Sequence, residues 1–452
     1  MEEYLKVLME QIRCKKAHPY IKQEILGHLE EQIEDNMSEG MSREEAEKAA
    51  VADMGSPVEA GIALDKVHRP KMNWGVVGLM AIISIAGIVL HEVMWREVGV
   101  LAQGSLEFVK YTLLGFSLML VVYRLDYSVI ARYAKVIAAG MLIACLAAKV
   151  QGNYIGGTPW LQIIYWDIYL YFPMLLYVPI YGAVVYKYHG QGYMGLCKAI
   201  LWMIIPVLLA WRLPMLMLSG TLLVSMMVVL TVVLAKGWFQ VERKPVIAAL
   251  WGCGVGIPLA SLAIIVNSGI FNEYQIARIK GFFSYTSNMD VHYITWRIRE
   301  MLENCQVIGN GNGSWMNVET LMGYIPECNT AYVFAYVLYN YGILAGILLG
   351  AVLVFLLFMI FRISFKQKNE LAMVMGCGCG MAIGVNILIN IAENLGLMPV
   401  TETFLPFFSK SGGGILVCYI MMGIILSIYR YKNIYPKHVN TELGVARITI
   451  RL

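Results

Sequence analysis

Residues 331–361 read AYVFAYVLYNYGILAGILLGAVLVFLLFMIF. This stretch holds 31 consecutive residues without an Asp, Glu, Lys or Arg. A helix of about 20 mainly apolar residues is already long enough to cross the hydrocarbon core of a bilayer. Within lipid, a single segment satisfies its own backbone hydrogen bonds only as an α-helix. The stretch therefore predicts a transmembrane helix and places the chain in a membrane.

The rest of the chain repeats this pattern. Of its 452 residues, 58% are hydrophobic and 15% are charged, whereas soluble proteins contain about 45–50% apolar and about 25% charged residues. Nine further apolar runs have the length of a span: 74–94, 106–124, 128–148, 163–186, 193–211, 214–235, 245–267, 370–394 and 412–430. We therefore expect an all-α, polytopic membrane protein of about ten transmembrane helices.

Acidic residues are concentrated at the start of the chain. Fifteen of the 31 acidic residues lie in the first 73 positions, and apolar residues recur there at helical spacing. Ser42 and Glu45 form a predicted capping box, in which each side chain binds a backbone N–H at the helix start. Ser56–Glu59 repeats this pattern, and Gly40 and Gly55 are placed to end helices. These signals predict three or four short helices.

The domain organisation follows from the contrast between the acidic first 73 residues and the apolar remainder of the chain. We predict a cytoplasmic helical domain over residues 1–72, a transmembrane domain over 73–435 with a large extracellular loop at 267–330, and a cytoplasmic tail over 436–452. Lys and Arg gather in alternate loops, and the positive-inside rule assigns those loops and both termini to the cytoplasm. The acidic start has no apolar core behind it, which predicts no cleavable signal peptide. The net charge of +4, without a basic run, argues against a nucleic-acid partner.

The extracellular loop 267–330 holds most of the ionisable residues on its side of the membrane. Loops of this length are uncommon in compact proteins and are usually functional, so we expect the chemistry on the outer face. A solvated loop of mixed charge is the alternative. Cys305 and Cys328 lie in the loop, either as a disulfide or as two thiols. The nine cysteines form no metal-binding pattern and His292 is a lone histidine, so we predict no metal site.

The N-terminal segment resembles a known module. Its shared stretches are Leu29–Asp35 (LEEQIED), Glu39–Ala46 (EGMSREEA), Asp53–Pro57 (DMGSP) and His68–Lys71 (HRPK). They are similar to the HAAS, or permease-prefix, domain that precedes membrane domains in Gram-positive bacteria. The resemblance implies a regulatory or interaction-mediating role. Because the segment contains no nucleophile, metal ligand set or phosphate loop, we interpret it as a binding module.

The membrane domain resembles the SEDS family, the FtsW/RodA/SpoVE glycosyltransferases of cell-wall synthesis, from about residue 74 to 435. Three blocks in the family's order carry the resemblance. They are Tyr274-Gln275-x-x-Arg278, then Gly309–Gly313 leading to Pro326-Glu327-x-x-Thr330, then Pro399-Val400-Thr401 with Leu405-Pro406-Phe407-x-Ser409. Trp160, after Gly156 and Gly157, is similar to the end of the family's Gly-rich stretch in an earlier outer loop.

The resemblance implies an activity and a set of residues. The family polymerises lipid II into glycan strands at the outer face of the bacterial cytoplasmic membrane, in cell division, elongation or sporulation. Asp290 matches its catalytic Asp, and a carboxylate is a suitable base for an acceptor sugar hydroxyl. The implied substrate-binding residues are Tyr274, Gln275, Arg278, Pro326, Glu327, Thr330, Thr401 and Ser409. Lys410, near the outer surface, is a further candidate that either meets a phosphate or extends to the membrane interface. The implied partner is a class B penicillin-binding transpeptidase, and a divalent cation, Mg or Mn, is expected at the diphosphate by analogy.

Several family residues are replaced in this chain. The block Pro-Glu-x-His-Thr-Asp becomes Pro326–Ala331, without its His and Asp, and an acidic pair further on becomes Tyr339 and Asn340. Charged groups inside a membrane are expensive and are usually kept for function. Two alternatives therefore stand beside the polymerase: a catalytically degenerate member that binds a lipid-linked saccharide or a partner and regulates envelope assembly, and an enzyme that acts on another undecaprenyl-linked glycan.

Overall fold

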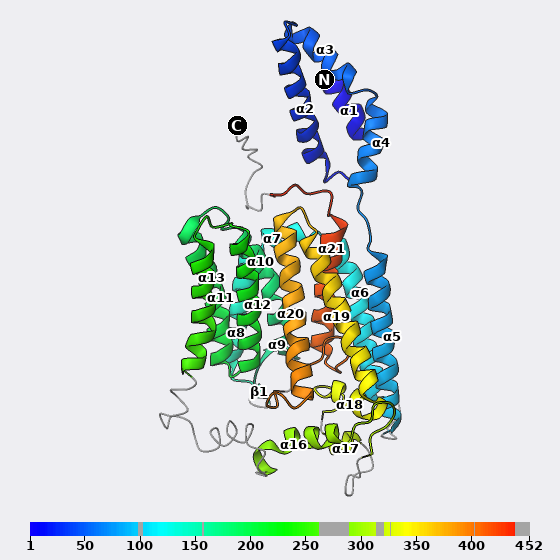
Figure 1. Cartoon of the computed structure of the whole chain (residues 1–452), viewed down its shortest axis with the longest axis vertical. Coiled ribbons are helices and arrows are strands. Elements are labelled where there is room, and N and C mark those ends of the chain that lie inside the picture. The colour runs from blue at the N-terminus through cyan, green and yellow to red at the C-terminus, as the bar shows by residue number, and fades with distance from the viewer. Residues whose placement is uncertain are drawn as a thin grey trace.

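The computed structural model describes residues 1–97, 103–155, 158–261, 289–312, 321–325, 327–401 and 403–438. In this part the chain is almost wholly helical, with one small three-stranded sheet (Figure 1). The N-terminal helices are α1 (Glu2–Glu10), α2 (His18–Ser38), α3 (Arg43–Asp53) and α4 (Pro57–His68). The helices of the bundle are α5 (Trp74–Glu97), α6 (Gln103–Arg124), α7 (Tyr127–Arg132), α8 (Ala134–Gln151), α9 (Tyr171–Leu175), α10 (Tyr177–Tyr186), α11 (Gly192–Arg212), α12 (Leu216–Ala235), α13 (Arg243–Trp251), α19 (Ile343–Phe365), α20 (Glu370–Asn394) and α21 (Gly412–Arg430).

The expected number of spans is confirmed. Nine helices in the described ranges are long and apolar enough to cross a membrane, and α9 with α10 forms a shorter apolar helical segment, Tyr171–Tyr186. The break expected near Arg212 is present, since α11 ends there and α12 begins at Leu216. After α13, the helix continues through a π-helical turn, Gly252–Gly256.

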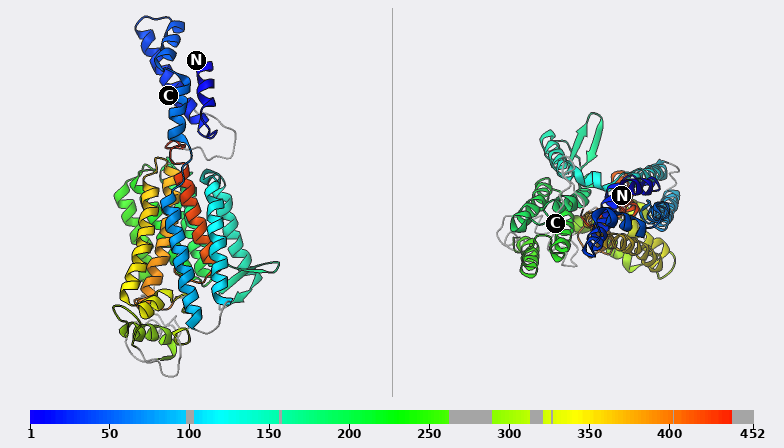
Figure 2. Two further views of the ribbon diagram at one scale, coloured as in Figure 1. Left: turned by 90° about the vertical axis from the view of Figure 1, so that its right-hand side faces the viewer. Right: turned by 90° about the horizontal axis from the view of Figure 1, so that it is seen from above.

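The run 163–186 was expected to be a single span, and this prediction is wrong at its start. Residues before Tyr171 form strands β1 (Tyr154–Ile155), β2 (Thr158–Ile163) and β3 (Trp166–Tyr169), which pair in sequence order as antiparallel neighbours. Aromatic and β-branched residues are frequent here and favour a strand over a helix. The sheet projects from the side of the bundle (Figure 2). The helical remainder, Tyr171–Tyr186, is shorter than the other spans, and its second part, α10, is buried along its whole course.

The stretch 331–361 also divides. It forms α18 (Val333–Tyr341) and α19, separated by Gly342. The backbone of Gly342 has φ 94° and ψ 169°, a conformation that is almost restricted to glycine. The 31 residues exceed one span, and the excess becomes a separate helix at the end of the bundle (Figure 1).

We expect Gly342→Ala to destabilise the protein by roughly 1–3 kcal/mol, because the added Cβ is strained at this φ. That Cβ would also lie 2.7 Å from the Val307 carbonyl oxygen. The measurement is the thermal unfolding midpoint in detergent. Gly350→Ala is the control, since Gly350 lies within α19 and its Cβ would meet nothing within 4 Å. An equal effect of both substitutions would contradict the account.

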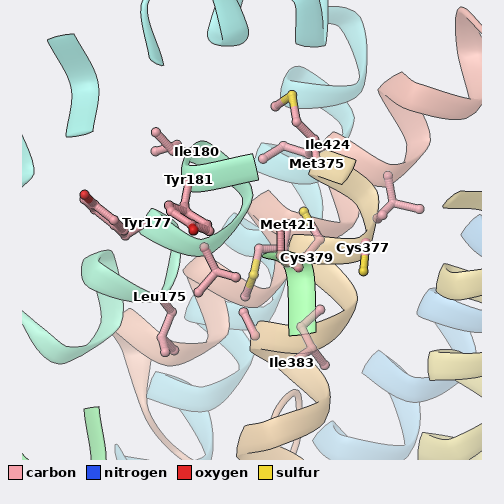
Figure 3. Packing of buried hydrophobic residues seen from close by; sticks show 14 of the residues in the cluster. Leu175, Tyr177, Ile180, Tyr181, Met375, Cys377, Cys379, Ile383, Met421 and Ile424 are labelled. Carbon is pink, nitrogen blue, oxygen red and sulfur yellow. The ribbon is translucent and has the colours of Figure 1, made fainter. Parts of the chain in front are cut away.

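The core of the bundle lies between α10, α20 and α21. Figure 3 shows Tyr181 of α10, Cys379 of α20 and Met421 of α21 among the buried side chains of this core. The small residues of the stretch Gly376–Gly380 (Gly-Cys-Gly-Cys-Gly) let neighbouring helices approach closely. A Cβ on Gly378 would lie 2.8 Å from the Cα of Pro179. This packing fixes α20, whose far end carries the polar residues described below.

The N-terminal helices stand at one end of the bundle, and α16 (Met289–Glu303), α17 (Leu321–Tyr324) and α18 lie at the other (Figure 1). The predicted capping box is confirmed: Glu45 N donates to Ser42 Oγ (3.4 Å), and Ser42 N donates to Glu45 Oε2 (3.1 Å). The second expected box is wrong, because Ser56 precedes α4 without a side-chain capping bond. The domain boundaries and the HAAS assignment stay predictions.

The N-terminal helices are attached to the bundle through a buried carboxylate. Lys16 Nζ lies 2.6 Å from Asp126 Oδ2, and Ser128 N donates to Asp126 Oδ1 (2.9 Å). Tyr435 donates to the same carboxylate and its ring meets that of Tyr20, 5.8 Å between centroids. Burial raises the pKa of Asp126, but the hydrogen bonds from Lys16, Tyr435 and Ser128 outweigh burial and hold it below the usual value.

The contribution of Asp126 to this attachment should depend on pH only at the extremes. A carboxylate with a lowered pKa stabilises fully above its unfolded pKa, about 3.9, and loses the effect as pH falls through its folded pKa. Lys16 is half exposed, so solvent screens the pair and Asp126→Asn should cost roughly 1 kcal/mol at neutral pH. We expect faster hydrogen–deuterium exchange at residues 431–435 in Asp126→Asn than in the wild type. Because the two proteins share every other titrating group, the difference between them, measured without metal, should stay constant between about pH 5 and 9 after correction for intrinsic rates. A difference that varies within this window would contradict the assignment.

Candidate functional site

The candidate residues gather at the end of the bundle opposite the N-terminal helices. Asp290 lies in the first turn of α16. Glu327, Thr330, Thr401, Ser409 and Lys410 lie in the segments around α18 and between α20 and α21. Tyr274, Gln275, Arg278 and Pro326 are outside the described residues. Figure 1 shows these elements at its lower edge.

Helix α16 is held in place by its second half. Arg299 donates from Nη2 (3.0 Å) and Nε (3.3 Å) to the carbonyl oxygen of Gly396, directly after α20. Arg297 donates to the carbonyl oxygen of Tyr324, whose hydroxyl donates to Glu300. Burial raises the pKa of this hydroxyl, and Glu300 raises it further. The helix that begins with the candidate base is thus fixed to both α17 and the end of α20.

Glu393 organises the segment that follows α20. Its side chain is 1% exposed. Thr401 donates to it from N (2.7 Å) and Oγ1 (2.6 Å), and Thr403 from Oγ1 (2.9 Å) and N (3.4 Å). Tyr332, just before α18, donates from its hydroxyl (3.4 Å). A buried charge requires such hydrogen bonds to offset its desolvation, so this carboxylate links Thr401 and Thr403 to Tyr332 at the start of α18.

Two asparagines extend this network along α20. Asn390 Nδ2 donates to the carbonyl oxygens of Ala331 (2.8 Å) and Thr403 (2.7 Å). Asn394 Nδ2 donates to Ala331 O (3.0 Å), and its Oδ1 accepts from Ala335 N (2.9 Å). Both asparagines are fully buried. Their hydrogen bonds join the start of α18 to the segment after α20 and satisfy buried polar groups on both.

Ser409 and Lys410 lie at the end of that segment. Ser409 Oγ accepts from Leu405 N (2.6 Å), which closes a turn. Lys410 N donates to Asn329 O (2.8 Å), while its Nζ lies 2.8 Å from Glu107 Oε2 and 5.2 Å from the centroid of the Trp95 ring. Lys410 therefore has a carboxylate partner in this structure. To bind a phosphate, its ammonium group would have to exchange the Glu107 carboxylate for the phosphate.

Glu327 and Thr330 form a short turn before α18. Glu327 is exposed and has φ 61°. Its carbonyl oxygen accepts from Thr330 N (2.9 Å), and Thr330 Oγ1 lies 3.4 Å from its Oε2. The divalent cation expected from the resemblance needs carboxylate oxygens, the ligands that Mg and Mn prefer. The exposed carboxylate of Glu327 could supply them. The oxygens of Glu393 are already occupied by hydrogen-bond donors.

The structure brings together the segments around Glu327–Thr330 and Thr401–Lys410, and links α16 to them through Arg299. The expected Gly-rich turn also belongs here: Gly311 N donates to Tyr339 O (2.8 Å), and Tyr339 OH donates to Gly311 O (3.2 Å). The organising role of Glu393 was not predicted. Its signal in the sequence was an acidic residue within an otherwise apolar run.

The chain was compared with known proteins. A profile of the FtsW/RodA/SpoVE family, described as "Cell cycle protein", matches residues 71–434. A probable peptidoglycan glycosyltransferase FtsW of Wigglesworthia glossinidia brevipalpis is 24% identical over 77% of this chain and 91% of its own length. The same activity is named for a relative from Enterococcus hirae, 35% identical, but that alignment covers 28% of this chain and 31% of the relative.

Solved structures show the same fold. A chain from the study "Structural coordination of polymerization and crosslinking by a peptidoglycan synthase complex" superposes with a TM-score of 0.65 at 19% identity, over 80% of this chain and 98% of that chain. The rod-shape-determining protein RodA of Thermus thermophilus gives 0.55 at 17% identity, over 80% and 97%. Because the family profile spans most of the sequence, this multi-pass membrane protein belongs to the FtsW/RodA/SpoVE, or SEDS, family.

Proposed function

We propose that this protein is a peptidoglycan glycosyltransferase that polymerises lipid II at the outer face of the cytoplasmic membrane. One observation carries the proposal. Arg299 ties α16, which begins beside Asp290, to Gly396. Gly396 opens the segment that holds Thr401, Ser409 and Lys410. A candidate base and candidate phosphate-binding residues are therefore anchored to one end of the bundle in a member of this family.

The proposed reaction needs a base and a cationic surrounding. Asp290 takes the proton of the acceptor sugar hydroxyl, whose oxygen forms the new bond to the anomeric carbon of the donor. The bond from that carbon to the diphosphate breaks, and undecaprenyl diphosphate leaves with the electron pair. Arg278 and Lys410 balance its charge. A divalent cation, Mg or Mn, would add charge stabilisation, and Glu327 would be among the residues that hold it.

The proposal includes an orientation and a partner. The N-terminal helices and the C-terminal tail would be cytoplasmic, because Lys and Arg gather in the loops at that end. A class B penicillin-binding transpeptidase would bind the outer and transmembrane surfaces and cross-link the new strands. The similar chain comes from a study of a peptidoglycan synthase complex, which supports a partner of this kind.

A second candidate function is regulatory. It is favoured by Lys410, whose ammonium already lies 2.8 Å from the Glu107 carboxylate, and by Tyr339 and Asn340 at positions where the family has acids. On this alternative the protein binds a lipid-linked saccharide or a partner without catalysis and regulates envelope assembly.

A polymerisation assay tests the proposal. Purified full-length protein is incubated with lipid II, with and without a candidate transpeptidase partner, and the products are separated by size. The proposal predicts glycan strands. Lipid II that binds but stays unpolymerised would favour the regulatory alternative. Polymer from another undecaprenyl-linked saccharide, but not from lipid II, would identify a different substrate.

A further inference from the structure

At the end of the bundle opposite the candidate site, three side chains from distant parts of the sequence converge. His189 lies in the loop after α10, Glu370 begins α20, and His438 lies beyond α21. Nε2 of His189 and Nδ1 of His438 are each 3.4 Å from Glu370 Oε2. All three ligand atoms lie within 4.8 Å of one another.

These distances suit a shared metal ion better than direct hydrogen bonds. N–H···O hydrogen bonds are about 2.7–3.2 Å long, shorter than both contacts. In a tetrahedral zinc site with bonds of about 2.0–2.1 Å, neighbouring ligand atoms are about 3.3 Å apart. Glu370 Oε2 is buried and accepts no hydrogen bond within the part of the chain that the structure describes. Its lone pairs therefore face the two imidazoles without a donor at bonding distance.

The other oxygen of Glu370 has a partner of its own. Lys437 Nζ lies 3.5 Å from Glu370 Oε1, which leaves Oε2 for a second ligand. Neutral imidazoles offer a lone pair to a metal.

We propose that His189, Glu370 and His438 bind one divalent transition-metal ion, with zinc the best fit to two imidazoles and a carboxylate. The sequence led us to predict no metal site, because its ligands are separated by long intervals of chain. The site lies at the other end of the bundle from Asp290, so the ion would take no part in the proposed glycosyl transfer. A fourth position is left for water or for a ligand from elsewhere.

The ion would act as a clamp on the segment after α21. His438 continues directly from residues 431–435, which contact the N-terminal helices: Tyr435 packs on Tyr20, and Asn433 Nδ2 donates to Val67 O (3.1 Å). Fixing His438 to α20 and to the loop after α10 would hold this segment between the bundle and the N-terminal helices. Metal binding would thus strengthen the attachment of the N-terminal domain.

The test uses full-length protein purified with a histidine-free affinity tag, stripped with a chelator and titrated with Co(II) and then Zn(II). Tetrahedral Co(II) gives a visible absorption band that zinc removes. We expect one ion per chain, with affinity at least tenfold lower in His438→Ala and in Glu370→Gln. His28→Ala is the control, because His28 is an exposed histidine 4.0 Å from Glu31.

A second readout separates metal binding from damage to the fold. Zinc should slow hydrogen–deuterium exchange at residues 431–438 in the wild type and in His28→Ala, but not in His438→Ala. Because His438 is exposed, its substitution should leave the fold intact, so a missing response to zinc would reflect lost metal binding. Binding that is absent from the wild type, or equal in His438→Ala and His28→Ala, would overturn the proposal and leave a set of ion pairs.

Discussion

Asp290→Asn is expected to lower the initial rate of lipid II polymerisation by about 10²–10⁴-fold, the usual contribution of a general base. The amide keeps the size of the side chain but cannot take the proton of the acceptor hydroxyl. Binding of lipid II should change little, because the substitution removes the base and leaves the proposed phosphate-binding residues. The measurement is the rate of lipid II consumption by purified protein, with lipid II binding determined in parallel.

The matched control is Asp167→Asn in β3. Asp167 is an exposed aspartate whose Oδ1 accepts from Asn153 Nδ2 (3.0 Å), so its substitution should leave the polymerisation rate within about twofold. A full rate in Asp290→Asn would remove this residue from the mechanism. An equal loss in both variants would show that the assay reports a general property of the protein.

Glu393→Ala is expected to have the largest effect on stability, about 3–5 kcal/mol, because it leaves several buried donors without their acceptor. Thr401 and Thr403 would lose their link to Tyr332 at the start of α18, and the rate of polymerisation should fall as a result. Glu393→Gln keeps one carbonyl oxygen as an acceptor and should cost less. The measurement is the thermal unfolding midpoint in detergent, followed by activity at a temperature where each variant is folded.

The control for this prediction is Glu92→Ala. Glu92 forms an exposed pair with Arg96, 3.0 Å apart and one helical turn along α5, and pairs of this kind contribute about 0.3–0.5 kcal/mol. A similar shift in Glu92→Ala and Glu393→Ala would contradict the central position given to Glu393. An unchanged activity in Glu393→Ala, despite lower stability, would show that polymerisation does not depend on the hydrogen bonds from Thr401 and Thr403 to Glu393.

Hydropathy predicted the membrane fold because burial in lipid demands long apolar helices. Hydropathy predicted the ends of the helices less well, because chain length and backbone geometry decide where a helix begins and ends. The apolar run 331–361 divides at Gly342, whose φ of 94° ends one helix and redirects the next. The first part of 163–186 forms strands, since its apolar residues pair with a neighbouring strand instead of crossing the bilayer.

The candidate site was predicted in part. Motif order pointed to Thr401 and Ser409, and the structure shows how the segment that holds them, together with Lys410, is fixed to α20 and to the turn before α18. The role of Glu393 depends on donors from Tyr332, Thr401 and Thr403, which a linear pattern does not bring together. The proposed metal ligands illustrate the same limit, because His189, Glu370 and His438 meet only through the packing of the bundle.

The most direct test of the account is a comparison of glycan strand lengths made from labelled lipid II by the wild-type protein and by Asp290→Asn, in the same proteoliposome preparation with the same transpeptidase partner. The account predicts long strands from the wild type and unreacted lipid II from the variant. Strands of equal length and amount from both proteins would contradict it.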